Sequence, residues 1–458
     1  MIAAPATAQQ MPGMAMPSAP ASAPPATTAP TPTDTRSQAM GPMPGMGAGA
    51  DPSGTAMAGM NMAGPMAGMT MQGMLGHEAM TRESSGTAWQ PDSSPMRGRM
   101  FEAGGWNLMA EGWINGIYDH QGAPRGQTRA FSASMAMLMA SRDVSEADRI
   151  GLRLMMSLDP IMGPQGYPLL FATGETADGR TPLIDRQHPH DLFMELAGSW
   201  AHQLGGGREV TLYAGLPGEP ALGPPTFMHR ISGMDDPEAP IGHHWFDSTH
   251  ITYGVVTAGF SGGSWKIEAS AFKGREPDQH RWNFETPRLD SWSVRASWNP
   301  TADLSLQLST GHLHSPEQLE PDVDEQRTTA SATYNKPLGT GRNWATTIAF
   351  SVKGEEPGPA LTGFLAESAL MFGRNEVYGR VEREDENELF GQTRQAGIIY
   401  PVEKLSLGYQ RETPVRPHLF VAVGGLASAY AYPAALVPSY GGRGVKSFML
   451  YVRLRYGS

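Results

Sequence analysis

Methionine is the residue whose type and spacing most directly suggest chemistry in this chain. Seven methionines lie within residues 57–74, separated mainly by Gly, Ala and Pro: Met57, Met60, Met62, Met66, Met69, Met71 and Met74. Five more lie upstream in the segments MPGMAM and MPGMG: Met11, Met14, Met16, Met43 and Met46. Thioether sulfur is a soft, uncharged ligand that suits Cu(I) or Ag(I) and discriminates against Mg²⁺ and Ca²⁺. Two or three such groups in a flexible chain can close around a linear or trigonal ion, so the pattern predicts monovalent copper or silver as cargo.

The alternative interpretation of these methionines is a low-complexity linker in which they have no ligand role. Leucine would serve a linker equally well, yet about half of the chain's 29 methionines lie before position 81. This uneven placement favours metal binding.

Histidines form the second candidate constellation. Seven of the 13 fall within a window of about sixty residues: His188, His190, His202, His229, His243, His244 and His250. Imidazole suits copper and zinc, and we predict His188, His190, His243 and His244 as metal ligands. The alternative is that they are hydrogen-bonding residues that make a packed loop rigid. No general base lies at a matching distance in the sequence from the segment DRQHPHD (185–191). We therefore predict neither catalytic residues nor an enzyme.

Composition limits the class of protein. Only 17% of the 458 residues are charged, Gly (55) and Pro (39) are abundant, and cysteine is absent. The absence of cysteine excludes disulfides and thiolate metal sites. The net charge of −11 argues against a nucleic-acid partner. No apolar run reaches about 18 residues, so we predict no transmembrane helix.

Alternation of apolar and polar residues dominates the chain from Trp106 onward. In residues 149–158, RIGLRLMMSL, the even positions are apolar and the odd positions include two arginines, a period of two that indicates β-strands. The same pattern predicts sixteen strands, at 106–118, 128–143, 149–162, 192–204, 209–216, 249–261, 265–273, 289–298, 304–312, 326–334, 343–353, 362–372, 376–383, 404–411, 419–430 and 446–456.

The connections between these strands are of two kinds. Short turns such as 145–148 and 262–264 alternate with longer connections such as 163–191 and 217–248. This asymmetry is typical of outer-membrane barrels. We therefore predict an all-β fold, a transmembrane antiparallel up-and-down outer-membrane β-barrel of about 16 strands, with both termini on the short-turn side. The segment 217–248 is the third long connection, which in general porins folds into the pore.

A polar face of the strands carries the charges expected to line the lumen: Arg149, Arg153, Lys266, Arg295, Arg380, Arg453, Arg455, Glu268 and Glu382. Burying one of these ions unpaired in a solid core would cost several kcal/mol. In a water-filled channel the ions stay hydrated, so this cost does not arise.

Three regions follow along the chain. Residues 1–8 end in the small-x-small form of a cleavage site and are interpreted as a remnant of a signal peptide. Residues 9–100 contain almost no β-branched or aromatic apolar residues, so we predict a disordered Met-, Pro- and Gly-rich arm in the periplasm. Residues 101–458 are predicted to form the barrel, in the outer membrane of a Gram-negative bacterium.

The methionine segments together with a barrel resemble copper-resistance outer-membrane proteins of the copper resistance protein B type. The likeness lies in residues 11–16, 43–47 and 57–74 and in the architecture, since the barrel sequence of that family is not found in 106–458. The segments DRQHPHD (185–191) and GHHWFDSTH (242–250) resemble those of uncharacterised exported proteins associated with metal-resistance loci. The resemblance implies metal resistance and periplasmic metal-efflux components as partners, beside the lipid bilayer.

These observations predict an outer-membrane barrel that binds monovalent copper or silver and transports or sequesters it, with no organic cofactor. Two alternatives stay open. One is a general or solute-selective porin with an incidental arm, and the other is a structural membrane protein or adhesin that presents the segments 163–191 and 217–248.

Overall fold

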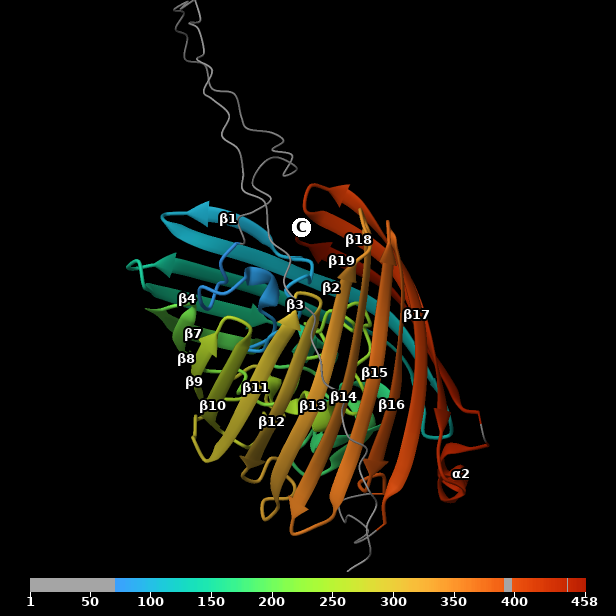
Figure 1. The fold of residues 1–458 in the computed structure, drawn as a ribbon. Helices are drawn as coiled ribbons and strands as arrows, with labels where there is room; N and C mark the ends of the chain where they lie inside the picture. The colour runs from blue at the N-terminus through green and yellow to red at the C-terminus, as the bar shows by residue number, and fades with distance from the viewer. Residues whose placement is uncertain (1–70, 391–397, 443) are drawn as a thin grey trace, which may run out of the picture. The chain divides into compact units, whose positions relative to one another are not determined.

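A closed β-barrel forms the body of the computed structural model, which describes residues 71–390, 398–442 and 444–458. The ring closes because β2 pairs with both β3 and β19, while β9 pairs with both β8 and β10 (Figure 1). All pairings in the wall are antiparallel and join neighbours in the chain, except for two pairs. These are the closing pair β2–β19 and the pair β4–β7, which spans an inserted hairpin. This confirms the predicted up-and-down barrel of 16 strands.

The wall strands are β2 (Trp106–Gly122), β3 (Thr128–Asp143), β4 (Asp148–Met156), β7 (Phe193–Gly205), β8 (Arg208–Gly215), β9 (Val255–Gly262), β10 (Trp265–Phe272), β11 (Ser291–Thr301), β12 (Leu304–Leu313), β13 (Asp324–Pro337), β14 (Arg342–Glu356), β15 (Ala360–Phe372), β16 (Asn375–Glu386), β17 (Tyr400–Arg416), β18 (Leu419–Ala431) and β19 (Lys446–Tyr456). The remaining elements are β1 (Arg99–Ala103), β5 (Tyr167–Thr176), β6 (Pro182–Gln187), the helices α1 (His243–Phe246) and α2 (Val437–Tyr440), and the 3₁₀ turns η1 (Met80–Arg82), η2 (Asp159–Met162), η3 (Ser248–His250) and η4 (Ala434–Leu436).

Two predicted strands are longer than the structure shows. The strand predicted over 149–162 ends at Met156, and the one predicted from residue 249 begins at Val255. Pro160 stands in the 3₁₀ turn η2 and removes a donor that a wall strand would need. Gly254 has φ of +94°, which turns the chain out of the loop and into β9.

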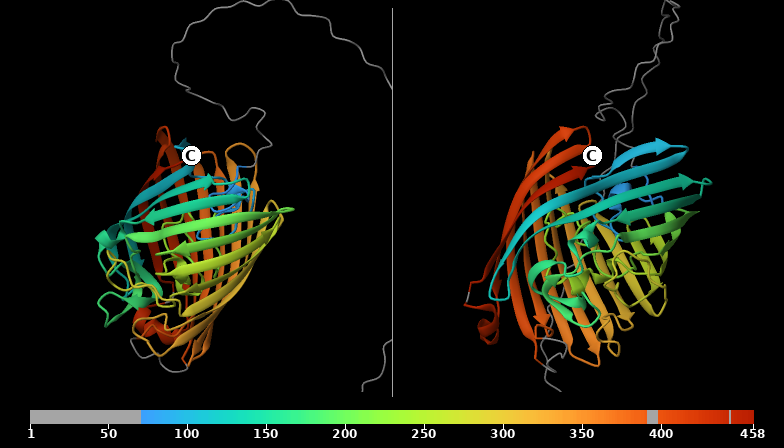
Figure 2. Two further views of the ribbon diagram at one scale, coloured as in Figure 1. Left: turned by 90° about the vertical axis from the view of Figure 1, so that its left-hand side faces the viewer. Right: turned by 180° about the vertical axis from the view of Figure 1, so that it is seen from behind.

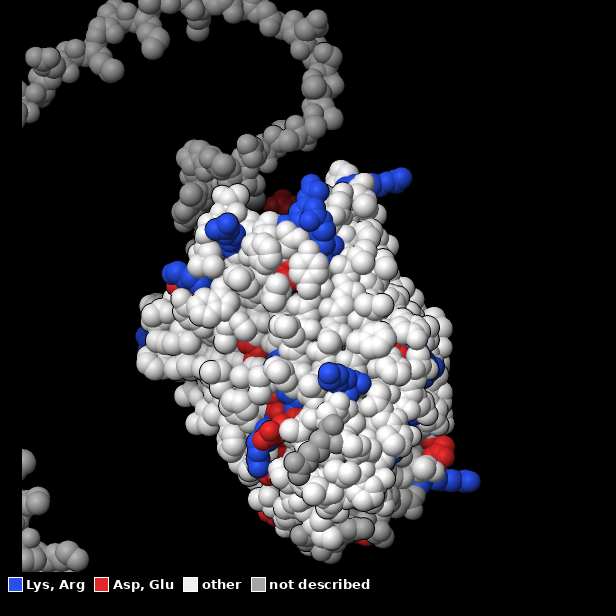
Figure 3. Space-filling view, turned by 90° about the vertical axis from the view of Figure 1, so that its right-hand side faces the viewer, with Lys and Arg blue, Asp and Glu red and all other residues white. Residues whose placement is uncertain are grey.

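The outer face of the barrel is apolar. In β19 the outward Leu450 and Val452 are 56% and 52% exposed, whereas the inward Arg453 is 2% exposed. Figure 3 shows one side of the barrel with few charged side chains across its middle. A closed sheet with this apolar exterior matches a bilayer, because every wall strand satisfies its backbone groups within the ring. The chain is therefore an outer-membrane β-barrel. Among the described residues, no helix has both the length and the apolar character needed to span a bilayer.

Placing a charge on this surface tests the membrane-facing assignment. Leu407 lies near the middle of β17 and is 62% exposed. We expect Leu407→Arg to lower the free energy of unfolding by about 2–4 kcal/mol, since an arginine near the bilayer midplane loses its hydration. Denaturant titration in lipid vesicles measures this loss. Leu407→Ile is the control, and equal stability of the two variants would contradict a lipid-facing position.

The two ends of the barrel differ as predicted. Short turns join β3 to β4, β7 to β8, β9 to β10, β11 to β12, β13 to β14, β15 to β16 and β17 to β18. Apart from residues 357–359 between β14 and β15, longer connections lie at the opposite end. The start of β2 and the end of β19 lie on the short-turn side (Figures 1 and 2). The connection after β4 carries the β5–β6 hairpin, and the connection after β8 carries α1 and η3.

The third long connection, residues 216–254, crosses the lumen. Almost every residue in it is buried. Arg230 donates to Glu367 of β15 at 2.5 Å, and Ser232 donates to Thr347 of β14 at 2.6 Å. Asp235 accepts from Arg453 of β19 at 2.6 Å. These bonds reach strands far from β8 and β9 around the ring, so the loop is anchored to the opposite wall.

The N-terminal segment, residues 71–98, also lies inside the barrel. Arg149 donates to the carbonyl of Gly73 at 2.6 Å and Arg153 to that of Gly86 at 2.9 Å, while Lys266 bonds the carbonyl of Thr87. Trp89 is 4% exposed and packs under the Lys266 ammonium.

The prediction of disorder over 9–100 is therefore wrong for residues 71–100. The prediction rested on the few apolar residues that the segment itself can bury. The structure shows a different source of order, because cationic side chains of the wall bind the backbone carbonyls of the segment. Residues 9–70 lie outside the described residues, as does the predicted signal-peptide remnant at 1–8.

The charges predicted to face the lumen do so, but they are buried and paired. Arg295 bonds Glu268 at 3.1 Å, Arg380 bonds Glu367 at 3.0 Å, and Lys404 bonds Glu238 at 2.6 Å. Arg295 and Arg380 are 1% and 2% exposed. The lumen in this structure is thus packed with protein rather than lined by exposed charge.

Candidate metal centre

Five imidazoles gather where the second and third long connections meet in the lumen. His188 and His190 follow β6, His243 and His244 open α1, and His250 closes η3. His243 is central, with ring centroids 5.5 Å from those of His188 and His244 and 5.2 Å from that of His250. The ring of His190 lies 5.3 Å from that of His250. We call these five residues the histidine cluster; each is 8% exposed or less.

Hydrogen bonds orient two members of the histidine cluster. His190 contacts the Asp159 carboxylate through Nδ1 at 2.8 Å, and His250 contacts the carbonyl of Asp247 through Nδ1 at 2.6 Å. Carbonyl and carboxylate oxygens accept, so Nδ1 carries the proton in both rings. In the neutral form of each ring, Nε2 holds the lone pair, and Nε2 has no hydrogen-bond partner within the protein in either residue. A ring held through one nitrogen with the other free is the arrangement of metal-ligating histidine.

Burial keeps three members of the histidine cluster, His188, His243 and His250, uncharged. Burial, reinforced by the neighbouring His244, lowers the pKa of His188 to about 3. Burial together with the adjacent imidazoles lowers the pKa of His243 and of His250 well below 6.5. Neutral imidazole is the form that binds metal ions. At neutral pH these rings therefore present lone pairs rather than positive charges.

Acidic groups border the histidine cluster on two sides. Glu276 lies 3.4 Å from Nδ1 of His244, and Glu175 lies 3.4 Å from Nε2 of His188. Arg281 pairs with Glu175 and, at 3.2 Å, with Asp191.

The donor geometry limits which metal fits. Across residues 71–390, 398–442 and 444–458, no three His, Asp or Glu side chains already meet in the geometry of a metal site. Structural zinc requires four such ligands in a tetrahedron. The Nε2 atoms of His190 and His250, in rings whose centroids lie 5.3 Å apart, are donors without a hydrogen-bond partner.

The predicted histidine ligands lie together, whereas the two predicted methionine ligands within the described residues differ in exposure. His188, His190, His243 and His244 all belong to the histidine cluster. Met74 is 1% exposed with its sulfur 3.6 Å from the Ser141 hydroxyl, whereas Met71 is 42% exposed. The other ten lie outside the described residues: Met11, Met14, Met16, Met43, Met46, Met57, Met60, Met62, Met66 and Met69.

Sequence reasoning missed two features of the site. His250 stands in the GHHWFDSTH segment, but its contact with His190 depends on η3, which follows α1 after a single residue. Methionines of the wall were also missed. Their signal was the inward parity of Met135, Met137 and Met139 in β3.

Comparisons with known proteins give a likeness of fold. No protein-family model and no curated protein sequence matches the chain. Similar solved structures include Salmonella typhi OmpF in complex with daunomycin, at 9% identity and a TM-score of 0.49 over 78% of this chain and 100% of that one. The outer membrane channel DcaP of Acinetobacter baumannii has 11% identity and a TM-score of 0.47, over 78% and 99%. An anion-selective porin from Comamonas acidovorans has 12% identity and a TM-score of 0.46, over 77% and 100%. At these identities nothing about the residues of the histidine cluster follows from them.

Proposed function

We propose that this outer-membrane barrel handles monovalent copper or silver, and that the ion binds in the lumen between His190 and His250. The observation that carries the proposal is the pair of buried imidazoles whose Nδ1 atoms are tied to Asp159 and Asp247 while both Nε2 atoms are free. Such a pair suits a soft ion of low coordination number.

The packed lumen favours this proposal over a general porin. The pore of a porin is an aqueous channel lined by polar groups. Here the charged wall residues Arg295, Arg380 and Arg453 are at most 2% exposed and are covered by residues 71–98 and by the third long connection. In the described part of the chain these wall cations are therefore not exposed to a hydrated solute, which favours a small ion as cargo.

The orientation of the chain completes the proposal. Short turns of bacterial barrels face the periplasm, so we place the short-turn side and the Met-rich residues before position 71 there. Methionines at that side would collect the ion, and the histidine cluster would hold it or pass it on. Periplasmic metal-efflux components are the partners that this orientation allows, and no bond-making chemistry is required.

Removing the histidine pair tests the proposal. The full-length chain in detergent micelles, stripped of metal, is titrated with Cu(I) under reducing conditions against a chromophoric chelator. We expect His190→Gln/His250→Gln to lower the affinity for one bound Cu(I) by about 100-fold or more. Loss of even the groups that support a metal ligand lowers metal affinity by about 10–100-fold. X-ray absorption of the bound ion should show fewer nitrogen neighbours.

The matched control is His202→Gln/His280→Gln, which changes two histidines whose side chains are 37% and 65% exposed. It should leave both the number of bound ions and their affinity unchanged. Identical titrations for the parent and the His190→Gln/His250→Gln variant would overturn the proposal and leave the porin interpretation.

A further inference from the structure

Methionine is concentrated inside the barrel rather than on its apolar exterior. Of the large apolar side chains that are exposed among the described residues, Met71 alone is a methionine; the others are Leu, Ile, Val, Phe, Trp and Tyr. In β3 the inward Met137 and Met139 flank the outward Leu138, which is 45% exposed. A requirement for apolar character alone would not explain why methionine is found inside the barrel and, apart from Met71, not among the exposed apolar side chains of the described residues.

The buried methionines all belong to one apolar cluster, which also contains Leu, Ile, Val, Phe and Tyr side chains. They are Met74, Met80, Met109, Met135, Met137, Met139, Met155, Met162, Met194, Met228 and Met449. Strand register brings several face to face. Met109 of β2 lies opposite Met139 of β3, and Met137 of β3 lies opposite Met155 of β4. Inward side chains at paired positions are direct neighbours.

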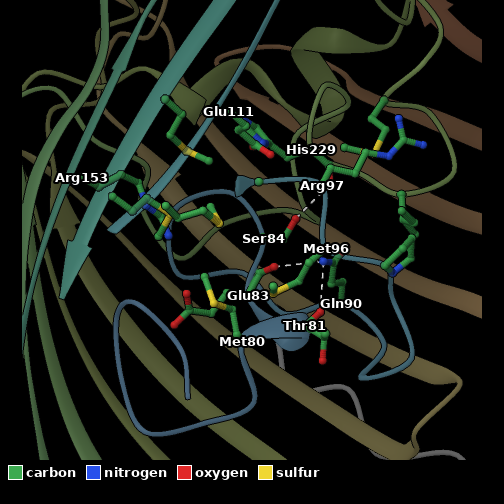
Figure 4. A pocket seen from close by; sticks show the side chains of 17 residues that line it. Met80, Thr81, Glu83, Ser84, Gln90, Met96, Arg97, Glu111, Arg153 and His229 are labelled. Carbon is green, nitrogen blue, oxygen red and sulfur yellow. Dashed lines mark hydrogen bonds between the residues drawn. The ribbon is translucent and has the colours of Figure 1, made fainter. Parts of the chain in front are cut away.

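The N-terminal segment closes a small cavity against this wall. The cavity has a volume of about 80 Å³ and is lined by six methionines, Met80, Met96, Met109, Met137, Met139 and Met234, together with His229. Figure 4 shows Met80 and Met96 approaching from the N-terminal segment and His229 from the far side. We call this space the methionine cavity. Three separate parts of the chain thus supply its thioethers: residues 71–98, strands β2 and β3, and the third long connection.

His229 adds a nitrogen donor beside the sulfurs. Its Nε2 lies 3.2 Å from the sulfur of Met155, and its side chain is 8% exposed. Burial, with the nearby Arg153 cation, lowers the pKa of His229 to about 4. The imidazole is therefore neutral at neutral pH and able to act as a ligand. The carboxyl groups of Glu83 and Glu111 and the guanidinium groups of Arg97 and Arg153 also line the cavity.

The methionine cavity adjoins the histidine cluster. Phe227, two residues before His229, stacks on His190 at 6.3 Å and meets His243 edge-on at 5.8 Å between ring centroids. One short stretch of the third long connection thus touches both places.

We propose that the methionine cavity is a second binding site, which takes Cu(I) or Ag(I) through thioethers of Met109, Met137 and Met139 with His229 as the nitrogen ligand. Passage of the ion from the methionine cavity to the histidine cluster rests on the proposed function. Binding of a soft metal in the cavity depends only on the donors that line it. Thioether and imidazole together select a soft monovalent ion over Zn²⁺, Mg²⁺ or Ca²⁺.

The test replaces sulfur while keeping volume. Met109→Leu/Met137→Leu/Met139→Leu removes three thioethers with side chains of similar size, a change that cores tolerate well. The full-length chain in detergent micelles is titrated calorimetrically with Ag(I). Since the chain has no cysteine, heat from thiols does not interfere. We expect the variant to bind one Ag(I) fewer than the parent, and X-ray absorption of the Cu(I) form to lose sulfur neighbours.

The control removes as many buried methionines from outside the cavity. Met162→Leu/Met194→Leu/Met449→Leu should bind as many ions as the parent. A cavity variant that binds the parental number of Ag(I) ions with unchanged affinity would overturn the inference. Heat-modifiable migration on gels checks that both variants fold.

The outcome is separable from that of the proposed function. His190→Gln/His250→Gln should keep the Ag(I) equivalent that the cavity variant loses, and it should lose nitrogen rather than sulfur neighbours. Loss of the sulfur-rich equivalent alone supports the cavity even if the histidine pair fails, and loss of the nitrogen-rich equivalent alone supports only the histidine pair.

Discussion

Acidification from pH 6.5 to pH 5 should remove part of the stability of the metal-free barrel, and His188 should account for one titrating proton. The pKa of His188 is about 3 in the folded protein, against an ordinary value of 6.5. Above pH 6.5 both folded and unfolded forms are neutral and the stability is fully present. As pH falls toward 3, only the unfolded form takes up the proton. Each such group lowers the free energy of unfolding by about 1.4 kcal/mol per pH unit. His229, with a pKa of about 4, acts in the same direction.

The measurement is urea unfolding of the metal-free chain at several pH values, compared with His188→Gln. Burial raises the pKa of Asp236 and of Asp247 to about 6, and these carboxyls titrate in the same window with the opposite sign. The difference in slope between parent and variant isolates His188, and we expect about 1.4 kcal/mol per pH unit. The exposed His280 supplies the control, His280→Gln, which should keep the parental slope. Equal slopes for parent and His188→Gln would contradict a buried neutral imidazole.

Removing the carboxylate of Glu367 should destabilise the folded chain by about 3–5 kcal/mol, because two buried arginines would lose their counter-charge. Glu367 accepts from Arg230 of the third long connection at 2.5 Å and from Arg380 of β16 at 3.0 Å. Ser232 also donates to it at 2.9 Å. The change Glu367→Ala therefore breaks the attachment of the loop to the wall as well as an ion pair.

Urea unfolding followed by heat-modifiable migration measures this loss. Glu102→Gln is the control, because Glu102 is exposed in β1, and it should shift the free energy of unfolding by no more than about 0.5 kcal/mol. A Glu367→Ala variant as stable as the control would mean that the arginines find other partners or water. Protease cleavage within 216–254 should also become faster in Glu367→Ala, since the loop loses its anchor.

The wall of the barrel could be predicted from the sequence, because a strand that faces lipid on one side and a polar interior on the other must alternate. The limits of β3 and β19 agree with the prediction at both ends. Errors arose where alternation continued by chance past a breaker, as at Pro160. The β5–β6 hairpin was missed, since all ten residues of β5 are buried and show no alternation.

The interior was harder to predict, because its order comes from partners distant in the sequence. Residues 71–98 have too little apolar surface to fold alone, and their fixed position depends on Arg149, Arg153 and Lys266 of the wall. The gathering of His188, His190, His243 and His244 was predicted from their short window. Which ring would pair with which depended on Asp159 and on the turn at His250. The methionine arm before residue 71 stays a prediction.

The position of residues 71–98 constrains the order of assembly. This segment precedes β2 in the chain, and the seam between β2 and β19 joins the first wall strand to the last. That seam forms only after the whole chain has been synthesised, when residues 71–98 are already available to the wall arginines. A sheet that curls around this segment encloses it as the seam closes. Residues 71–98 would then contact the wall strands before the pairing of β2 with β19 completes the barrel.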